Sequence, residues 1–387
     1  MRQMTGRKAM TKGARTAALA AVGVLAFGTL AACGDDGGSG SGSGGSGGGG
    51  GGEASGKVGV ILPDATTSPR WETQDRPSLQ AAFDEAGIEA DIQNAQGDVD
   101  QFGRICDGMI NDQVNVIMIT NLDSDSGKAC LSKAADAGIP SIDYDRLTLG
   151  GGASYYVSFD NVRVGELMGE GLISCLDAED KAQANIVYIN GLAADNNASL
   201  FKQGYEQGLA DKIDSGDYTL VGDQAGDWDA TVAGNAFEQL LTANQGKIDG
   251  VVSANDTMAG GIIARLRAQN LNGQIPVTGQ DASVEGLQNI LRGDQCMTVY
   301  KNTNLEAETA AKVAIALITG STDDADALVT GTVPDTETGE DVQSILAEPV
   351  SVTTENMQQV FDDGSADPAE VCSGDLAQLC EEAGVGG

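Results

Sequence analysis

The sequence contains no histidine, and this absence excludes several common kinds of catalytic and metal site. A Ser-His-Asp triad, a Cys-His dyad and every His-ligated metal site need an imidazole that the chain does not have. The seven cysteines include no Cys-x-x-Cys pair, which is the spacing typical of zinc and thioredoxin-like sites. No catalytic residue, cofactor or metal is therefore expected.

Basic residues are also scarce. Lysine and arginine total 22 against 57 aspartates and glutamates, which gives a formal charge of -35. Five of the basic residues lie in the first 15 positions, in a leader that should be removed, so the mature chain keeps 17 basic and 57 acidic residues and a charge of -40. Such a surface repels nucleic acid and anionic lipid, so a neutral or cationic ligand is expected and no nucleic-acid partner.

The first 33 residues have the three parts of a bacterial lipoprotein signal peptide. A basic start is followed by an apolar stretch from Thr16 to Leu30, which is too short for a membrane span and fits a secretory signal. Leu30-Ala31-Ala32-Cys33 resembles a lipobox, which implies cleavage before Cys33 and acylation of its thiol; the alternative is an uncleaved anchor. We therefore expect an extracytoplasmic protein on the outer face of the cytoplasmic membrane.

Residues 34–56 are almost entirely glycine, serine and acidic residues, a composition that favours a flexible tether. Its typical reach is roughly 24–29 Å. From Lys57 onward, apolar runs alternate with segments of helical period, which predicts βαβ units and a parallel sheet. The expected strands are 57–62, 89–95, 114–120, 139–145, 155–159, 184–190, 218–223, 250–254, 276–279 and 296–300. The expected helices are 71–86, 99–111, 126–137, 162–176, 198–210, 231–243, 258–269, 284–291 and 305–319.

This alternation predicts an α/β protein with two similar parallel-sheet lobes joined by a multi-strand hinge. Chain crossings are expected after Phe159, after Lys301 and near Pro349. The N-terminal lobe would then comprise residues 57–160 and 302–349, and the C-terminal lobe residues 161–301 and 350–387. A monomer is expected.

Polar residues follow the expected strands, at the sheet edge where ligands of α/β proteins bind. The sequence Ile142-Asp143-Tyr144-Asp145-Arg146 is the clearest example, because an apolar strand ends in a carboxylate beside a guanidinium. This pair suits a ligand rich in hydroxyls, although an ordinary ion pair is the alternative. Trp71 and Trp228, the only tryptophans, lie in polar surroundings at helix starts and could enclose a sugar ring between them, whereas the alternative is two core residues.

Several short stretches occur in a fixed order along the chain: Arg70-Trp71, Ile142 to Arg146, Ser158-Phe159-Asp160-Asn161 with Val164-Gly165, Asp195-Asn196-Asn197-Ala198, Val221-Gly222-Asp223-Gln224, Ser253-Ala254-Asn255-Asp256, Gly279-Gln280-Asp281-Ala282 and Thr298-Val299-Tyr300-Lys301. Together they resemble the periplasmic sugar-binding proteins of ABC importers with the type I fold, above all their xylose-binding and multiple-sugar-binding members. The resemblance spans about residues 57–361. It implies an aldopyranose, above all D-xylose, held in an inter-lobe cleft and presented to the membrane subunits of a permease.

The resemblance also implies which side chains hold the sugar. Trp71 and Trp228 would enclose it, and its hydroxyls would bind Arg70, Asp145, Arg146, Asn196 or Asn197, Asn255, Asp281 and Lys301. For Asn196, a helix cap is an equal alternative. The chain departs from this pattern in two places: Glu72-Thr73-Gln74 replaces a more basic stretch of the xylose binders, and the acidic tail with Cys372 and Cys380 has no clear counterpart.

Six cysteines remain after Cys33 in a compartment that permits disulfides, and they allow fifteen pairings. Cys372 and Cys380 are close in sequence, and Cys106 and Cys130 fall on consecutive expected helices. The pair Cys175–Cys296 then follows by elimination.

Other functions remain open at this point. The chain could bind glucose, galactose or several sugars and serve chemoreception. It could also be a secreted carbohydrate-active enzyme that uses paired carboxylates such as Asp145 and Asp281, but both have basic or amide neighbours that favour the ionised form. A transcription regulator of the same fold class is disfavoured by the secretion signal and by the lack of a basic DNA-binding segment.

Overall fold

A computed structural model describes residues 55–66 and 68–386, which belong to the compact unit Gly52–Gly387. The expected signal peptide, Cys33 and most of the expected tether lie outside the described residues, so cleavage, acylation and anchoring stay predictions. Within the described part of the chain, no helix combines the length and the apolar character that a membrane crossing requires.

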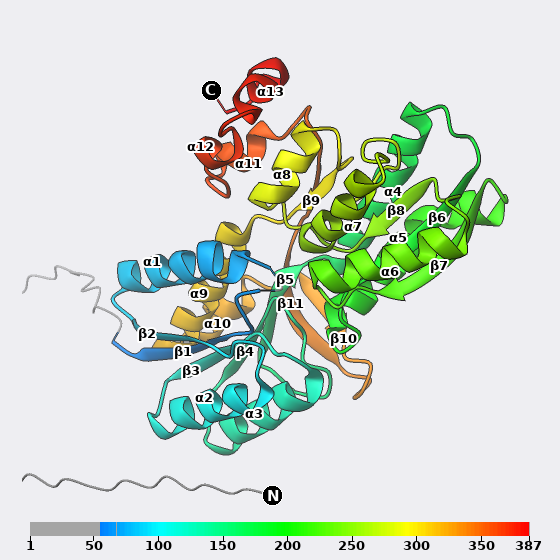
Figure 1. The fold of residues 1–387 in the computed structure, drawn as a ribbon. Coiled ribbons are helices and arrows are strands. Elements are labelled where there is room, and N and C mark those ends of the chain that lie inside the picture. Colours follow the sequence, from blue (N-terminus) through cyan, green and yellow to red (C-terminus); the bar gives the residue numbers. More distant parts are fainter. Residues whose placement is uncertain (1–54, 67, 387) are drawn as a thin grey trace, which may run out of the picture. The chain divides into compact units, whose positions relative to one another are not determined.

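The larger sheet has seven strands in the order β10-β11-β5-β4-β3-β1-β2, and every neighbouring pair is parallel except β10 with β11. Helices α2 and α3 cover one face, and α1, α9 and α10 cover the other (Figure 1). Its strands are β1 (Lys57–Leu62), β2 (Glu89–Asn94), β3 (Val116–Ile119), β4 (Ser141–Tyr144), β5 (Tyr155–Phe159), β10 (Gly331–Pro334) and β11 (Asp341–Ala347). Its helices are α1 (Arg76–Ala86), α2 (Val99–Asn111), α3 (Ser124–Asp136), α9 (Thr303–Thr319) and α10 (Thr322–Asp326).

The second sheet is parallel and has three strands in the order β7-β6-β8. Its helices pack in two pairs, α4 with α5 and α6 with α7, around one apolar core. The strands are β6 (Ala184–Asn190), β7 (Tyr218–Ala225) and β8 (Gly250–Ser253), and the helices are α4 (Asn161–Ala178), α5 (Asn196–Asp214), α6 (Ala230–Ala243) and α7 (Asp256–Ala268).

A small antiparallel pair, β9 (Thr298–Tyr300) with β12 (Val350–Val352), continues this second part. Beside it an apolar cluster joins α8 to the C-terminal helices. These helices are α8 (Val284–Leu291), α11 (Gln358–Asp362), α12 (Pro368–Val371) and α13 (Leu376–Ala383). The chain passes between the two parts at β5–α4, at β9–α9 and at β11–β12, next to the three positions expected from the sequence. The lobe boundaries themselves stay a prediction.

Several expected bounds are shifted by one to four residues, and two expected elements differ in kind. Residues 276–279 form no strand: only an isolated bridge between Val251 and Val277 is present, and Pro276 has no N–H group to donate. The expected helix 71–86 begins with a short π-helical turn, η1 (Trp71–Asp75), before α1. This turn brings Arg70 and Trp71 to the carboxyl ends of the strands.

The structure contains the three disulfides proposed from the sequence. Cys106–Cys130 joins α2 to α3, Cys175–Cys296 joins α4 to the residues before β9, and Cys372–Cys380 staples α12 to α13. Their Cα atoms are 5.9, 6.4 and 5.8 Å apart.

Candidate functional site

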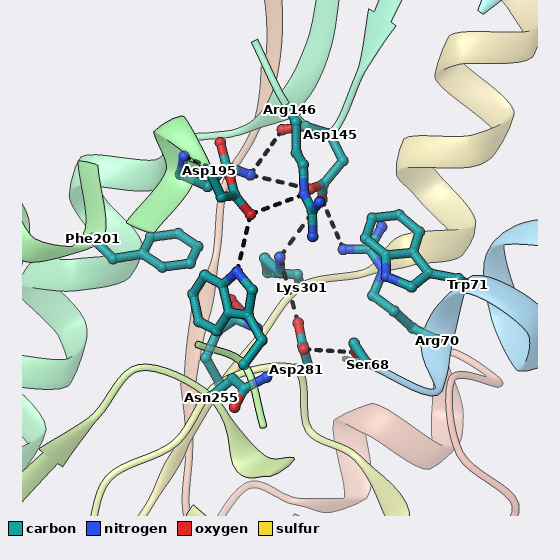
Figure 2. A pocket seen from close by; sticks show the side chains of 13 residues that line it. Ser68, Arg70, Trp71, Asp145, Arg146, Asp195, Phe201, Asn255, Asp281 and Lys301 are labelled. Carbon is teal, nitrogen blue, oxygen red and sulfur yellow. Dashed lines mark hydrogen bonds and ion pairs between the residues drawn. The ribbon is translucent and has the colours of Figure 1, made fainter. Parts of the chain in front are cut away.

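Side chains from both parts of the fold meet around one small polar cavity of about 30 Å³, space for very few water molecules. In Figure 2, Phe201 and Trp71 lie on opposite sides of the charged groups of Asp145, Arg146 and Lys301. The cavity is lined by Ser68, Arg70, Trp71, Asp145, Arg146, Asp195, Asn197, Phe201, Trp228, Asn255, Gln280, Asp281 and Lys301. Nine of the ten expected sugar-binding residues are therefore together at this cavity; Asn196 is not among them.

Asp145 follows β4 and lies at the centre of the site. Its backbone is left-handed, with φ of 64°, and its carbonyl accepts hydrogen bonds from Tyr156 Oη (3.0 Å), Ser158 Oγ (2.7 Å) and Asn197 Nδ2 (3.0 Å). Its carboxylate accepts from Arg70 at 2.9 Å. Burial alone would raise the pKa of Asp145, but the nearby positive charges of Lys301 and the two arginines outweigh this effect and lower it. Asp145 is thus a fixed, ionised acceptor.

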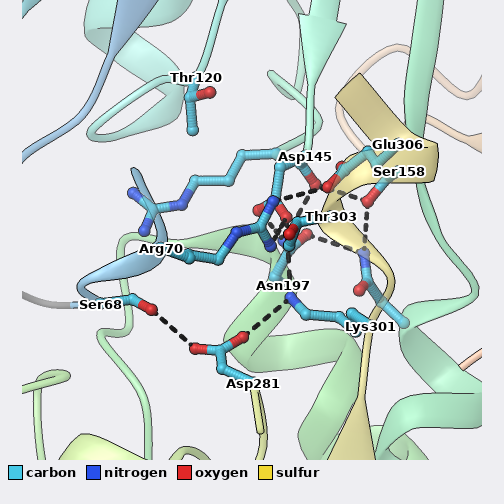
Figure 3. A network of polar contacts seen from close by, with 12 residues as sticks. Ser68, Arg70, Thr120, Asp145, Ser158, Asn197, Asp281, Lys301, Thr303 and Glu306 are labelled. Atoms are coloured by element: carbon cyan, nitrogen blue, oxygen red, sulfur yellow. Dashed lines mark hydrogen bonds and ion pairs between the residues drawn. The ribbon is translucent and has the colours of Figure 1, made fainter. Parts of the chain in front are cut away.

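Arg70 joins this acceptor to a buried cluster of acids, which Figure 3 shows in part. Its guanidinium binds Asp75 through two nitrogens, at 2.9 and 2.7 Å, and Glu306 at 2.6 Å. Burial raises the pKa of Glu306 well above its usual value despite the charge of Arg70. The Arg70 side chain is only 3% exposed and also lies 4.5 Å from the centre of the Trp71 ring. Most of its donors are therefore used inside the protein, and Arg70 both lines the site and holds Asp145.

Arg146 does not form the contact ion pair with its neighbour Asp145 that was the alternative interpretation of the sequence. Its Nε instead binds the Asp195 carboxylate at 2.9 Å, and its NH1 donates to the Asn121 carbonyl at 3.1 Å. Asp195 begins α5 in the second part of the fold, so this ion pair crosses the site. Burial is the main cause that raises the pKa of Asp195, and Arg146 opposes it.

Both tryptophans line the cavity, although each also packs against an apolar cluster of its own part of the fold. Trp228 donates its Nε1 hydrogen to Asp195 at 3.2 Å and meets Phe201 edge-on, with ring centres 6.2 Å apart. Within the described residues, the buried Nε1 of Trp71 has no hydrogen-bond partner. Each tryptophan therefore packs in an apolar core and also lines the cavity, and its contact with a sugar stays a prediction.

The polar residues of the second part are held by local bonds. Asp195 caps α5 by accepting from the Asn197 amide, so Asn196 is not the cap. Asn196 is also not among the residues that line the cavity, and a contact between Asn196 and a sugar stays a prediction. Asn197 instead donates to the Asp145 carboxylate at 3.1 Å. Asn255 caps α7 through the Met258 amide while it lines the cavity.

Asp281 and Lys301 complete the site. Asp281 accepts a hydrogen bond from Ser68 at 2.9 Å, a contact between the two parts of the fold. The Lys301 ammonium lies 3.4 Å from Asp281 and 3.7 Å from Asp145, and 5.3 Å from the centre of the Phe159 ring. Lys301 immediately follows β9, at one of the places where the chain passes between the two parts of the fold. The ammonium group that lies near both the Asp145 and the Asp281 carboxylates therefore belongs to a segment that joins the two parts.

Four residues that line the cavity were not among those expected: Ser68, Asp195, Phe201 and Gln280. Ser68, Asp195 and Gln280 are in the polar stretches that follow strands, so strand-end position was a usable signal for them. Phe201 lies on a buried face of α5 and has no such signal. Within residues 55–66 and 68–386, no group of three or more acidic or cysteine side chains is arranged to hold a metal ion.

A family model described as a periplasmic binding protein domain matches residues 58–322, well over half of the chain. The chain belongs to the periplasmic binding proteins. Among its relatives are the D-xylose-binding periplasmic proteins of Escherichia coli (strain K12) and Haemophilus influenzae, 35% and 33% identical over 310 residues. Each of these alignments covers 80% of this chain and 90% of the relative. A multiple sugar-binding periplasmic receptor of Rhizobium radiobacter is 31% identical over 328 residues, with the same coverage.

Solved structures agree with this assignment. A carbohydrate transporter solute-binding protein from Chloroflexus aurantiacus, in complex with D-glucose, is 28% identical with a TM-score of 0.73, covering 81% of this chain and 97% of that protein. An ABC transporter solute-binding protein from Clostridium phytofermentans with bound β-D-glucose has the same identity and TM-score and is covered over 99% of its length. This periplasmic binding protein is thus a member of the sugar-binding family of ABC transporters, with the type I fold.

Proposed function

We propose that this periplasmic binding protein is the extracytoplasmic solute-binding lipoprotein of a sugar ABC importer and that it binds an aldopyranose, D-xylose, in the polar cavity. The supporting observation is that Trp71 and Trp228, one from each part of the fold, line the same cavity. Flat indole faces bind the C–H surfaces of a pyranose, and the charged and amide groups between them bind its hydroxyls.

Sugar binding requires the two lobes to separate and close again. The cavity of about 30 Å³ is much smaller than a pyranose, and its polar groups bind one another, as in the pairs Arg146–Asp195 and Ser68–Asp281. A sugar would replace such contacts with its hydroxyls and would favour the closed arrangement, because only there do both lobes touch it. The lobes in this proposal are residues 57–160 with 302–349 and residues 161–301 with 350–387.

A binding role without catalysis fits the carboxylates better than glycosidase chemistry. Asp145 is held ionised by Lys301 and Arg70, so it cannot serve as the proton donor that glycoside hydrolysis needs. Asp281 is bound by Ser68 and Lys301. In this proposal the protein is not an enzyme.

D-Xylose is preferred because the xylose-binding relatives are 35% and 33% identical to this chain, whereas the multiple sugar-binding receptor is 31% identical and the glucose complexes are 28% identical. The second candidate is a binder of glucose, galactose or several sugars that serves chemoreception. A pentopyranose lacks the exocyclic CH₂OH of a hexose, so the bulk beside Trp71 decides admission. The lipid on Cys33 would hold the protein near its permease, which would recognise the closed form.

Calorimetric titration of the purified protein with xylose, glucose, galactose, ribose and arabinose tests this proposal. We expect heat of binding with xylose and weaker or no binding with the others. Absence of heat with all five sugars, or hydrolysis of a disaccharide, would contradict the proposal.

The variant Trp228→Ala tests the role of the indole. It should lose at least roughly 30-fold in sugar affinity, because a buried aromatic contact in a binding site is typically worth 2 kcal/mol or more. Its circular dichroism spectrum should be unchanged. Tyr155→Phe is the control, since the Tyr155 hydroxyl binds Asp326 away from the cavity. Unchanged affinity in Trp228→Ala would remove the indole from the site.

A further inference from the structure

A side chain close to Trp71 contacts a residue near the C-terminal end of the chain. Gln74, in the stretch after Trp71, donates from Nε2 to the Ser365 carbonyl at 2.9 Å. Ser365 belongs to the C-terminal segment 357–386, which lies beyond residue 322, where the match to the family model ends. The same Gln74 side chain accepts a hydrogen bond from Thr303 Oγ1 at 2.5 Å. Gln74 thus connects the start of α9 to the C-terminal segment.

The C-terminal segment, here residues 357–386, is firmly attached to the second part of the fold. Its apolar side chains pack with those of α8 and β9, and the disulfide Cys372–Cys380 staples its last two helices. Gln288 on α8 donates to the Glu370 carbonyl at 3.1 Å. The buried Ser365 hydroxyl lies 2.7 Å from the Tyr300 hydroxyl at the end of β9. A contact with Ser365 is therefore a contact with the part that carries Asp281 and Lys301.

Gln74 and Asn304, in contrast, are attached to the seven-stranded part. Gln74 lies on η1, three residues after Trp71, and Asn304 lies on α9, where it accepts from Ser78 at 2.6 Å. Asn304 donates to the Asp363 carbonyl at 3.3 Å. Two side chains of one part thus hold two backbone carbonyls of the other, beside the β9–α9 crossing.

We propose that residues 363–365 are a non-covalent fourth link between the two lobes, anchored by Gln74, which limits how far the lobes separate and so prepares the cavity for its ligand. The segment also lines a wide cavity of about 960 Å³ that shares Ser68, Arg70 and Asp281 with the polar cavity. A link at this place therefore restrains the lobes beside the wide cavity that adjoins the polar cavity. Gln74 acts through Ser365 and is a positioning residue.

The effect on binding follows from preorganisation, and this part of the inference rests on the proposed sugar-binding function. Closure around a ligand costs conformational entropy, and this cost is smaller when the lobes of the ligand-free protein open less widely. Breaking the link should therefore weaken sugar binding and speed sugar release. Loss of one or two hydrogen bonds corresponds to roughly 3- to 10-fold in affinity.

Gln74→Glu tests the link with the smallest change. It keeps an acceptor for Thr303 but places a carboxylate oxygen against the Ser365 carbonyl, which breaks the bond between the lobes. Gln101→Ala is the matched control, because Gln101 Nε2 bonds to the Asn94 carbonyl at 2.9 Å within one part. In stopped-flow tryptophan fluorescence, Gln74→Glu should release sugar roughly 3- to 10-fold faster than both the wild type and Gln101→Ala.

A second measurement needs no sugar and separates this inference from the proposed function. In hydrogen exchange of the ligand-free protein, peptides covering residues 360–371 should exchange faster in Gln74→Glu than in Gln101→Ala, and small-angle scattering should give a larger radius of gyration. Cys372→Ser with Cys380→Ser should act in the same direction and add little to Gln74→Glu. If exchange and radius match the control, the link does not exist, whether or not a sugar binds. If no sugar binds the wild type but the ligand-free differences are present, the link stands and the sugar assignment fails.

Discussion

Asp145, Trp228 and Asp281 all have left-handed backbone, with φ of 64°, 59° and 97°. Residues other than glycine rarely adopt this region, because each such residue costs about 1–3 kcal/mol and persists only where its surroundings enforce it. At Asp145 three hydrogen bonds to one carbonyl supply that enforcement. Three of the residues expected to hold the sugar therefore lie on strained backbone.

Gly191, which follows β6, makes room for Trp228. A Cβ atom at this position would overlap the Trp228 indole. We predict that Gly191→Ala displaces the ring and lowers sugar affinity by about tenfold or more, and that overpacking lowers the free energy of unfolding by about 1–3 kcal/mol. Calorimetric titration and urea unfolding measure the two effects.

Gly103→Ala is the control for this substitution. Gly103 lies within α2, and a Cβ there would meet no atom within 4 Å. Alanine is the better helix former by about 1 kcal/mol, so this variant should be slightly more stable and bind sugar normally. Normal sugar affinity in Gly191→Ala would mean that the position of Trp228 does not govern binding.

At the scale of elements, the alternation of apolar runs predicted most of the fold. The bounds expected for β1, α2, β5, β6 and α8 are those of the structure. Other helices begin earlier than expected, because aspartate caps precede polar first turns that apolar periodicity does not detect. Asp123, Asp160 and Asp195 each accept a backbone hydrogen bond at the start of α3, α4 and α5. Local capping chemistry, rather than the apolar pattern, sets these boundaries.

The parts that escaped prediction depend on contacts distant in sequence. Glu306 binds Arg70 across 236 positions, and no local pattern marks it as a partner. The C-terminal helices α11 and α12 have only five and four residues, too few to display a helical period. Strand-end position located the polar site residues well, whereas the partners that each one uses came only from the structure.

Asp256, the first residue of α7, stabilises the loop that carries Gln280 and Asp281 through hydrogen bonds. Its carboxylate accepts from the Ser283 amide at 2.8 Å, from Gln295 at 2.7 Å and from Thr298 at 2.9 Å. Burial raises the pKa of Asp256 to about 7, although the Gln295 and Ser283 donors oppose this shift. The folded protein therefore keeps a proton here at pH values where the unfolded chain has lost it.

We predict that this proton makes stability depend on pH. Because the folded pKa lies above the unfolded value of 3.8, the contribution is fully present below pH 4 and is lost as pH rises toward 7. The melting temperature of the wild type should fall between pH 5 and pH 8. In Asp256→Asn the decrease in melting temperature between pH 5 and pH 8 should be smaller by roughly 2–4 °C, as measured by calorimetric scans. Part of the slope should remain, because burial also raises the pKa of Asp143 to about 7.

Asp256→Asn should also lower overall stability, since an amide nitrogen would face the Ser283 amide in place of an acceptor. Asp326→Asn is a suitable control: it changes one acidic contact, to Tyr155, far from this loop. A wild-type slope retained in full by Asp256→Asn would show that another group carries the pH dependence.

For the whole molecule, the excess of acidic residues shapes stability and ligand choice in different ways. The formal charge of -35 means that the acidic side chains repel one another, which opposes the compact state. The same negative charge attracts cations from solution. The cavity, however, contains Arg70, Arg146 and Lys301 together with its acids. A neutral ligand binds such a site without releasing counterions. A cationic ligand would bind more tightly because of the negative potential of the surrounding surface.

Salt therefore separates a neutral ligand from a cationic one. Raising NaCl from about 0.01 to 0.5 M shortens the screening length from roughly 30 Å to a few Å. The melting temperature should rise by roughly 2–4 °C as self-repulsion is screened, while the dissociation constant for the sugar should stay within about twofold. Choline chloride at the same ionic strength controls for specific effects of sodium. A dissociation constant that weakens tenfold or more with both salts would mean that the bound solute carries positive charge, and the choice of a neutral sugar would be wrong.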